Sequence, residues 1–411
     1  MTETHTDFCV VGGGPAGLTL ALLLLRSGAR VTVLEKLRSL DREYRGEILQ
    51  PGGQALLHGL GVLRGARERG CYEHRRFLLE ERGRILINGD YGRLPGPFNC
   101  LLSIPQRHIL EELLGQCSAH AGFDYLASTR CSALIEDTRQ RVRGVIGRGP
   151  DGDRIVRAHC VVGADGRYSK VRQLAGLPYD RFEAFDQDVL WFKLPAGDDL
   201  PRDVRIFRAG GNPALAYASY PDGIQIGWTL PHKGYRELAA RGLGHVKEQL
   251  SRAVPEQAGR IEVEITSFRD LSLLDVFSGT AREWVRPGLL LIGDSAHTHG
   301  PIGAQGINLA IQDAVAAHPA LMSSLRSGDD GTEPLREYVT SRGRDVRRIM
   351  KIQRMQSKVM LSTGGLSSAA RPRVAAAVSR TPVYRTVLNQ LAFGNRAIAI
   401  RRDLFQPAVR S

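Results

Sequence analysis

Short apolar runs and a glycine-rich turn alternate at the start of the chain. Residues 8–11 form an apolar run that leads into a turn with glycines at 12, 14 and 17. A helix-like segment follows from Pro15 to Ser27, and a second apolar run, residues 31–34, ends at Glu35. The pattern predicts a strand, a glycine turn, a helix and a second strand with an acidic residue at its end.

Each glycine of this turn has a physical role in binding a dinucleotide. Gly12 permits a tight turn, Gly14 lets the backbone approach a pyrophosphate, and Gly17 lets the helix pack closely against the strand. The N-terminus of the helix offers N–H groups and the positive end of its dipole to phosphates. Glu35 is placed to accept hydrogen bonds from a ribose. The stretch therefore predicts a site for FAD or NAD.

The rest of the chain divides into regions of different pattern. The first region predicts helices over 54–57 and 107–119, a hairpin of strands 76–80 and 84–88, and strands over 131–136, 143–147, 154–157 and 160–163. Between residues 183 and 270 the alternation predicts an antiparallel sheet with a helix near 245–253 and strands over 189–194, 204–208, 214–220, 224–230 and 261–268. A buried strand at 288–294, a helix over 306–325 and further helices in the last seventy residues complete the prediction.

Composition narrows the class of protein. Hydrophobic residues make up 42% and charged residues 24% of the 411 residues, which suits a globular chain of two packed domains. The six cysteines include no Cys-x-x-Cys pair, so we expect neither a zinc site nor disulfides and favour a reducing compartment. No basic and apolar leader precedes Asp7, and the longest apolar stretch, Leu18 to Leu25, is too short to cross a bilayer. The expected location is cytoplasmic, and no metal is expected.

The formal net charge of +13 leaves several anionic partners open. Nucleic acid, an anionic membrane surface and an anionic cofactor all suit such a charge. No helix-turn-helix, zinc-finger or RNA-binding pattern accompanies it, so we expect no nucleic acid. Arginine-rich usage from a high-GC coding sequence is the explanation that we prefer.

Basic residues recur at helical spacing in the C-terminal region, at positions 344, 347, 348, 351, 354 and 358. They lie opposite Val346, Ile349, Met350 and Val359. One interpretation is a helix that associates weakly with a membrane surface. The other, which we prefer, is a helix packed on the body of the protein with a solvated basic face.

Two further motifs follow predicted buried strands. Residues 165–172 read Asp-Gly-Arg-Tyr-Ser-Lys-Val-Arg, and residues 293–297 read Gly-Asp-Ser-Ala-His, continuing as Pro-Ile-Gly-Ala-Gln-Gly-Ile-Asn at 301–308. With the N-terminal turn, they resemble the group A FAD-dependent monooxygenases of the para-hydroxybenzoate hydroxylase fold, over essentially the whole chain. Residues 46–53 look most like ubiquinone-pathway hydroxylases and squalene epoxidases, and residues 382–394 like the former. Bacterial alkylquinolone-pathway monooxygenases share the general layout.

This resemblance implies an α/β fold with two interleaved domains. The expected Rossmann-like FAD-binding domain is discontinuous and consists of residues 1–75, 100–180 and 280–335. The expected substrate domain is an antiparallel β-sheet from residues 76–99 and 181–279, and residues 336–411 form a C-terminal helical region.

The resemblance also implies where FAD is held. The turn at 301–306 would hold the carbonyl oxygen at position 2 of the flavin ring and stabilise negative charge at N1. Asp294 would accept a hydrogen bond from a hydroxyl of the cofactor. Asp165 would lie near the pyrophosphate and the path of the nicotinamide nucleotide. Arg45 and Arg107 match two basic positions that face the phosphates or adenosine, and Cys131 would contribute backbone only. The implied cofactor-binding residues are Gly12, Gly14, Pro15, Ala16, Gly17, Glu35, Lys36, Arg45, Arg107, Cys131, Asp165, Asp294, Pro301, Gly303, Gly306, Ile307 and Asn308.

The implied activity is that of a single-component flavoprotein monooxygenase. NAD(P)H, as NADPH or NADH, would reduce FAD, and O2 would add to form a flavin C4a-hydroperoxide that hydroxylates or epoxidises an apolar or aromatic secondary metabolite. Phe192, Tyr217 and Trp228 are the expected pocket residues on the antiparallel sheet. The flavin carries the chemistry, so no side chain is assigned a catalytic role, including His297 and His299.

Two alternatives stay open at this point. The first is an FAD-dependent reductase of the same fold that acts on a prenyl-type double bond, as geranylgeranyl reductases do. The second is a protein that retains FAD without turnover. Oxygen-dependent NAD(P)H consumption that a substrate stimulates separates the monooxygenase from both.

Overall fold

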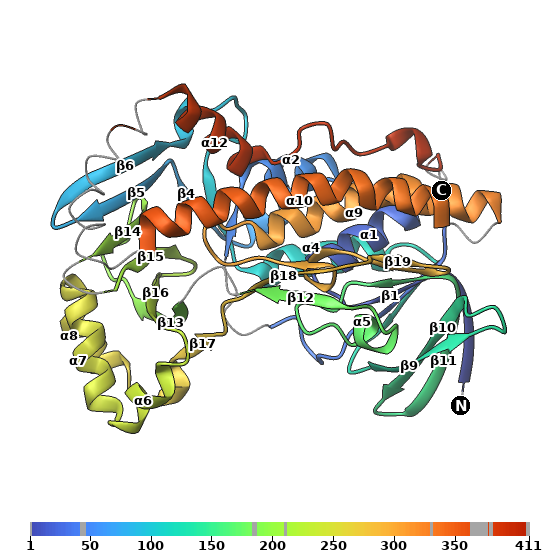
Figure 1. Ribbon diagram of the computed structural model, residues 1–411, viewed down its shortest axis with the longest axis horizontal. Coiled ribbons are helices and arrows are strands. Elements are labelled where there is room, and N and C mark those ends of the chain that lie inside the picture. The colour runs from blue at the N-terminus through green and yellow to red at the C-terminus, as the bar shows by residue number, and fades with distance from the viewer. Residues whose placement is uncertain are drawn as a thin grey trace.

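The chain builds an elongated body from a large sheet covered by helices and a second sheet beside it (Figure 1). The structure is a computed structural model that describes residues 2–41, 47–182, 187–208, 212–328, 332–361, 377 and 381–407. The N-terminal strand lies at one end, and the C-terminal segments, coloured red, run along the helical layer (Figure 1).

A largely parallel sheet forms the centre of the first layer, in the order β19-β20-β11-β1-β2-β8. Pairs β20–β11, β11–β1, β1–β2 and β2–β8 are parallel, and β9 and β10 extend the sheet as an antiparallel arm from β11. Its strands are β1 (Thr2–Val11), β2 (Val31–Leu34), β8 (Phe123–Leu126), β9 (Arg130–Glu136), β10 (Val142–Gly149), β11 (Gly152–Gly163), β19 (Val285–Arg286) and β20 (Leu289–Leu291).

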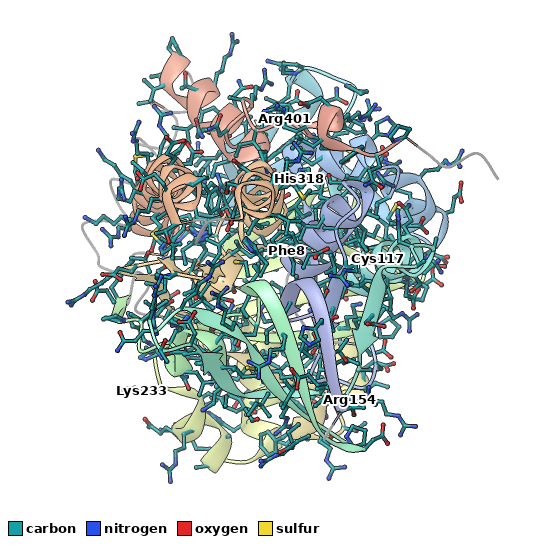
Figure 2. All side chains as sticks on the ribbon, turned by 90° about the vertical axis from the view of Figure 1, so that its right-hand side faces the viewer. Phe8, Cys117, Arg154, Lys233, His318 and Arg401 are labelled. Atoms are coloured by element: carbon teal, nitrogen blue, oxygen red, sulfur yellow. The ribbon has the colours of Figure 1, made fainter. Side chains whose placement is uncertain are left out.

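Strand β1 divides its side chains between two cores, because successive residues of a strand point to opposite faces. Phe8 and Val10 pack under the helices, whereas Cys9 and Val11 pack toward β9 and β10. Figure 2 shows Phe8 near the middle of the molecule, between strands and helices. The helices on this side are α1 (Pro15–Arg26), α2 (Pro51–Gly59), α3 (Leu63–Glu68), α4 (Gln106–Ser118), α9 (Gly306–Ser327) and α10 (Thr332–Leu361). Helix α1 is buried on every side, which explains its nearly continuous apolar sequence.

The second sheet has the order β17-β13-β16-β15-β14-β5-β6. All its pairs are antiparallel except β14–β5, which is parallel, so the expectation of a purely antiparallel sheet needs that correction. Its strands are β5 (Arg76–Glu81), β6 (Arg84–Asp90), β13 (Gln187–Pro195), β14 (Val204–Arg208), β15 (Ala214–Ser219), β16 (Gly223–Pro231) and β17 (Ser272–Leu274). One face is covered by α6 (Tyr235–Ala240), α7 (Leu243–Ala253) and α8 (Ala258–Glu264) (Figure 1).

Short elements make up the segments that connect the two large sheets along the chain. They include two small three-stranded sheets, with the orders β12-β18-β21 and β3-β7-β4. The remaining elements are β3 (Ile48–Leu49), β4 (Tyr72–His74), β7 (Leu101–Ser103), α5 (Lys170–Leu174), β12 (Tyr179–Phe182), β18 (Ser278–Ala281), β21 (His297–Thr298), α12 (Pro382–Phe393) and the 3-10 turns η1 (Tyr91–Arg93), η2 (Pro255–Gln257), η3 (Phe268–Asp270), η4 (Gly293–Ser295) and η5 (Arg402–Leu404).

Two sequence expectations about elements are wrong. Residues 261–268 form the end of α8 and the start of η3 rather than a strand. Ile261 and Ile265 are buried one helical turn apart, and Val263 between them is 70% exposed. The apolar residues of this segment therefore follow the spacing of a helix and not that of a strand. The segments 154–157 and 160–163 belong to one continuous strand, β11.

Helix α10 packs its apolar stripe against the body. Val346, Ile349 and Met350 are buried, whereas the basic residues are exposed, at positions 344, 347, 348, 351, 354 and 358. The side chain of Val359 lies outside the described residues. This arrangement supports the interpretation of a packed helix with a solvated face. Among the described residues, no helix has the length and apolarity that a bilayer-spanning segment requires.

Candidate active site

A cavity of about 850 Å³ runs between the parallel sheet and the second sheet. Its walls come from segments far apart in the chain: the N-terminal turn, the ends of β2 and β9, the turn after β11, the loop before α9, and strands β13, β15 and β17. The carboxyl ends of β1, β11 and β20 meet at this edge of the sheet, the usual place for a ligand in a parallel α/β sheet.

The N-terminal turn closes one end of the cavity with its backbone. Gly12 has a φ of +113°, and a Cβ there would lie 2.4 Å from the Ala164 carbonyl oxygen, so only glycine fits. A Cβ on Gly17 would lie 1.9 Å from the Gly12 carbonyl oxygen. Gly14 stands at the N-cap of α1 in an extended conformation, and Pro15 and Ala16, which line the cavity with it, occupy the first helical positions. The helix therefore presents its N-terminus to the cavity.

Glu35 fixes the same turn from the end of β2. Its carboxylate accepts hydrogen bonds from the Gly13 N–H at 2.8 Å and from the Leu37 N–H at 3.0 Å, and the side chain is buried. Lys36 and Arg130 follow it along the cavity wall. Cys131 also lines this end, and burial raises the pKa of its thiol to about 12, so it stays protonated.

The turn after β11 is held by its acid. Asp165 accepts hydrogen bonds from Ser169 Oγ at 2.5 Å and from the Lys170 N–H at 2.6 Å, which caps helix α5. Ser295 Oγ donates to the same carboxylate at 3.2 Å and ties the turn to η4. Asp294 lies beside it on the cavity wall, with Oδ2 3.8 Å from Arg167 Nε. Asp165 therefore shapes the turn, and it lines the cavity together with Gly166, Arg167 and Lys170.

The loop before α9 lines the middle of the cavity. Pro301, Gly306 and Ile307 contribute to the wall, and a Cβ on Gly306 would meet no atom within 4 Å, so this position opens onto free space. Gly303 does not line the cavity, but its φ of +76° lets the loop turn. Asn308 braces the loop: its Oδ1 accepts from the Gln50 N–H at 2.9 Å, and its Nδ2 donates to the Ala304 carbonyl at 2.7 Å.

Behind this loop lies a chain of buried polar side chains from β21, α9 and α10. His299 lines the cavity, and its Nε2 is 3.0 Å from Nδ1 of His297. His297 Nε2 is 2.7 Å from Asp313 Oδ2, and Arg342 Nε donates to Asp313 Oδ1 at 2.6 Å. Burial, aided by the charge of His297, lowers the pKa of His299 to about 3. Burial alone would raise the pKa of Asp313, but His297 and Arg342 lower it below its usual range.

The second sheet supplies an apolar and aromatic wall. Trp191, Leu215, Tyr217 and Leu274 line the cavity, together with Ile48. The backbone N–H of Glu47 bonds to the Tyr217 hydroxyl, and burial raises the pKa of this phenol well above its usual value. A flat, uncharged ligand surface would match this wall.

Two of the three expected pocket residues lie elsewhere. Phe192 and Trp228 are buried in the core that the sheet forms with α7 and α8, on the face away from the cavity, and neither lines the cavity. Leu190 and Phe192 pair with Trp228 and Ile226 across the sheet, so these four side chains share one face. Tyr217 alone of the three faces the cavity.

Of the two expected arginines, the structure describes Arg107. Arg45 lies outside the described residues. Arg107 is half exposed and pairs with Asp41 at 3.0 Å and with Glu111 at 3.3 Å. It does not line the cavity, whereas its neighbour Gln106 does.

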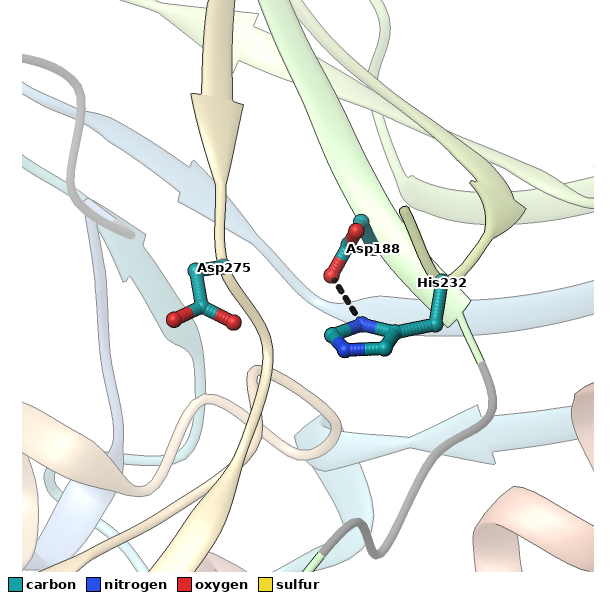
Figure 3. Close-up of side chains that lie close together, drawn as sticks. All are labelled: Asp188, His232 and Asp275. Atoms are coloured by element: carbon teal, nitrogen blue, oxygen red, sulfur yellow. Dashed lines mark hydrogen bonds and ion pairs between the residues drawn. The ribbon is translucent and has the colours of Figure 1, made fainter. Parts of the chain in front are cut away.

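A cluster of Asp188, His232 and Asp275 lies at the start of β13 and just beyond the ends of β16 and β17 (Figure 3). Asp188 Oδ1 is 2.9 Å from His232 Nδ1, and Asp188 Oδ2 accepts from the Lys233 N–H at 3.0 Å. Asp275 is bound by Arg181 at 3.0 Å and by the Tyr168 hydroxyl at 2.7 Å. The Arg181 guanidinium already neutralises this carboxylate, so we assign no metal to the cluster.

Sequence reasoning missed several cavity residues: Gln106, Thr129, Arg130, Arg167, Lys170, Trp191, Leu215, Leu274 and His299. For Trp191 a signal was present. Lys193 breaks the apolar run of β13 at a position two residues away, on the same side of the strand as Trp191. A polar residue on that side indicates the face that is not covered by helices.

The cavity suits FAD by its donors and its shape. Two helix N-termini, those of α1 and α9, face it, and the cations Lys36, Arg130, Arg167 and Lys170 stand along its length. Such groups neutralise a pyrophosphate. Close backbone contacts at Gly12 and Gly17 hold the turn and the α1 N-terminus tightly together, and Gly306 leaves open space where a ring system would lie. Fold and site together define an FAD-dependent oxidoreductase whose cavity also has an apolar wall.

Comparison with known proteins agrees with this class and narrows it. The chain belongs to the FAD binding domain family, whose model matches residues 5–353. It is 64% identical to 6-methylpretetramide 4-monooxygenase of Streptomyces rimosus over 403 residues, which cover 98% of this chain and 96% of the relative. It is 26% identical to 3-demethoxyubiquinol 3-hydroxylase of Escherichia coli, over 90% of this chain and 93% of that enzyme. The crystal structure of Pseudomonas aeruginosa PqsL with 2-aminobenzoylacetate superposes with a TM-score of 0.75 at 25% identity, covering 91% of this chain and 99% of PqsL.

The protein is therefore an FAD-dependent flavoprotein monooxygenase. The expected resemblance to group A monooxygenases and the expected α/β fold are confirmed.

Proposed function

We propose that the protein uses NAD(P)H and O2 to hydroxylate a polycyclic aromatic polyketide of the 6-methylpretetramide type. The observation that carries this proposal is the 64% identity to the Streptomyces rimosus enzyme over nearly the full length of both chains. The reaction balances as substrate, O2, NAD(P)H and a proton giving hydroxylated substrate, water and NAD(P)+. A cytoplasmic location and the domain boundaries given above belong to the same proposal.

The residues that would hold FAD divide by the part of the cofactor they suit. The turn from Gly12 to Gly17 and the N-terminus of α1 suit the pyrophosphate, and Glu35 suits the ribose of the adenosine. Asp294 suits a hydroxyl of the ribityl chain, and the N-terminus of α9, at Gly306, suits the electron-rich edge of the flavin ring. Bound FAD supplies the redox chemistry: reduced by NAD(P)H, it activates O2 and delivers one oxygen atom to the substrate.

The wall of Trp191, Leu215, Tyr217 and Leu274 would hold the substrate. These side chains are apolar or aromatic and line the same cavity as the loop at Pro301, so the wall suits a flat ring system. Closing this part of the cavity with apolar groups excludes water from the reacting carbon, which favours transfer of oxygen to the substrate over its loss as hydrogen peroxide.

Tyr217 is the polar group that this wall offers to the substrate. Because the Glu47 N–H bonds to its oxygen and burial keeps the phenol protonated, its own O–H is available as a donor. Glu47 is in turn held by Lys193 at 3.1 Å and by the Ser219 hydroxyl. Tyr217 would thus donate a hydrogen bond to a phenol or carbonyl oxygen and set the orientation of the ring.

The test is a turnover experiment under ¹⁸O2. FAD-loaded protein, NADPH or NADH, and 6-methylpretetramide are expected to give a product with one added ¹⁸O atom, with NAD(P)H consumption stimulated by the substrate. Reduction of a prenyl-type double bond without O2 would instead support the alternative reductase. Retention of FAD with neither activity, over a panel of polycyclic, quinolone and polyprenyl compounds, would contradict the proposal.

A further inference from the structure

The hydrogen bonds of Gln353 determine which way its amide points. Its Nε2 donates to the Ile302 carbonyl at 2.7 Å and to the Gly300 carbonyl at 3.1 Å. Two carbonyl oxygens can only accept, so the amide nitrogen must face them and Oε1 must face His299. His299 Nδ1 is 3.1 Å from this Oε1 and must therefore carry a hydrogen that it donates.

The same reasoning passes from His299 to His297. His299 is held neutral, since burial lowers its pKa to about 3, so its second nitrogen, Nε2, has a lone pair. His297 Nδ1, 3.0 Å away, must then be the donor. On the other side, His297 Nε2 faces the ionised carboxylate of Asp313 at 2.7 Å and must also donate. Both ring nitrogens of His297 carry hydrogen, which makes it an imidazolium.

The charges around His297 agree with a cation there. Asp313 and Asp345 face one guanidinium, that of Arg342, so an uncharged His297 would leave one negative charge in excess. Tyr338, on α10 with Arg342, stays a neutral phenol because burial raises its pKa well above its usual value. The indole of Trp284 lies against His297 with ring centroids 4.9 Å apart, a contact that favours a cationic ring.

We propose that His297 is a buried cation that favours the anionic, reduced form of FAD in the cavity. It stands one side chain behind the wall, because His299 separates it from the cavity. His299 uses both nitrogens within the protein, so it has no hydrogen to give to a ligand. His297 is thus a positioning residue that acts through charge, and Gln353 and Asp313 fix its protonation state.

The effect follows from the charge that reduction creates. A hydride from a nicotinamide nucleotide would bring two electrons and one proton to bound FAD, so the reduced ring would carry one negative charge. A nearby cation in surroundings of low dielectric constant stabilises this anion more than the neutral oxidised ring. The inference rests on FAD in the cavity and does not depend on the substrate of the proposed function.

The first experiment measures the midpoint potential of bound FAD in His297→Gln. Glutamine keeps an amide donor for Asp313 but has no charge. We expect the ratio of reduced to oxidised FAD at a given potential to fall about tenfold, a shift of about 30 mV to lower potential for a two-electron couple. The matched control is His318→Gln, since His318 is a buried histidine too, but it bonds to Ser27 Oγ at 2.8 Å and does not line the cavity. His318→Gln should leave the potential unchanged.

The second experiment observes the protons directly in the wild-type holoprotein. With ¹⁵N-labelled histidine, His297 is expected to show hydrogen on both ring nitrogens and His299 on Nδ1 alone, at neutral pH. Equal potentials in His297→Gln and His318→Gln, or a bare nitrogen on His297, would overturn the inference. If His297→Gln retains no FAD, the NMR result on the wild type decides. A shifted potential without any hydroxylation would contradict the proposed function and leave this inference standing.

Discussion

Trp191 and Phe192 are neighbours on strand β13 but belong to different parts of the protein. Trp191 lines the cavity, whereas Phe192 is fully buried in the core beneath α7 and α8. The pleat of the strand alone separates the two side chains. The residue at position 191 can therefore contact a ligand in the cavity, whereas the residue at position 192 is constrained by packing in the core.

This relationship predicts that substitutions to leucine at these two neighbouring positions change different properties, the kinetics in one case and the stability in the other. Trp191→Leu should raise the KM for an aromatic substrate at least fivefold and increase the hydrogen peroxide released per NAD(P)H, because the wall loses an aromatic face and admits water. Phe192→Leu should leave both quantities unchanged and lower the free energy of unfolding by about 1 kcal/mol. Steady-state kinetics gives the KM, a peroxide assay gives the hydrogen peroxide released, and urea unfolding gives the free energy of unfolding. A higher KM in Phe192→Leu alone would place the substrate on the other face of the sheet.

A second prediction concerns the close approach of α1 and the N-terminal turn. In Gly17→Ala the new methyl would lie 1.9 Å from the Gly12 carbonyl oxygen and 3.2 Å from Val10 Cγ1, both in the buried core. The turn must move, so we expect a loss of about 3 kcal/mol or more in stability and little bound flavin. Thermal unfolding and the flavin absorbance of the purified protein measure these effects.

The control for this prediction is Gly115→Ala in helix α4. Gly115 is exposed, and a Cβ there would meet no atom within 4 Å. Alanine in an exposed helix interior should raise stability by about 0.5–1 kcal/mol and leave the flavin content unchanged. Unfolding of Gly17→Ala at the wild-type temperature would contradict the assigned packing.

The sequence predicted those features that a local pattern encodes. The turn from Gly12 to Gly17 could be predicted because strand, turn and helix are contiguous and each glycine has a steric reason. The face of β13 was harder, since a strand with apolar residues on both sides gives no alternation to follow. The strand predicted over 261–268 failed because apolar residues at 261, 263 and 265 fit both a strand and a helix that leaves Val263 exposed.

The buried network behind the cavity could not be predicted from the sequence. Asp313 and Arg342 are 29 positions apart on different helices, and His297 joins them from a third element. No spacing rule relates such positions, because tertiary packing alone brings them together. The histidine pair was visible in the sequence, but its partners were not, so its charge could not be inferred.

A third prediction concerns acid stability. Burial lowers the pKa of His318 to about 4 and that of His299 to about 3, both below the unfolded value of about 6.5. The unfolded chain therefore binds protons that the folded protein does not, so the free energy of unfolding falls as the pH drops below about 6.5 and continues to fall toward pH 3–4. At pH 5 each histidine should lower the free energy of unfolding by about 2 kcal/mol relative to neutral pH.

His318→Gln tests this linkage. Urea unfolding at pH 7.5 and pH 5.0 should show a smaller difference in the variant than in the wild type, by about 2 kcal/mol, because glutamine does not titrate. Asp313 adds a second, lower step, since its lowered pKa gives stability that is present above pH 4 and lost below it. An identical pH dependence in variant and wild type would show that folding does not lower the pKa of His318.

The fourth prediction separates binding of FAD from folding. Gly306 is the first residue of α9, lines the cavity, and would direct a Cβ into open space. In Gly306→Val the side chain should occupy room that the flavin ring needs, so FAD affinity should fall at least tenfold. The melting temperature of the apoprotein should change little, because no protein atom is displaced. Titration with FAD followed by fluorescence gives the affinity.

Gly244→Val is the matched control, because Gly244 also opens a helix, α7, with no atom within 4 Å of its Cβ, and lies outside the cavity. Both variants place valine in the first turn of a helix, so any general cost of valine there is shared. Gly244→Val should bind FAD as the wild type does. Equal affinities in the two variants would show that the flavin ring lies away from the N-terminus of α9, and the roles proposed for Ile307 and Pro301 would fail with it.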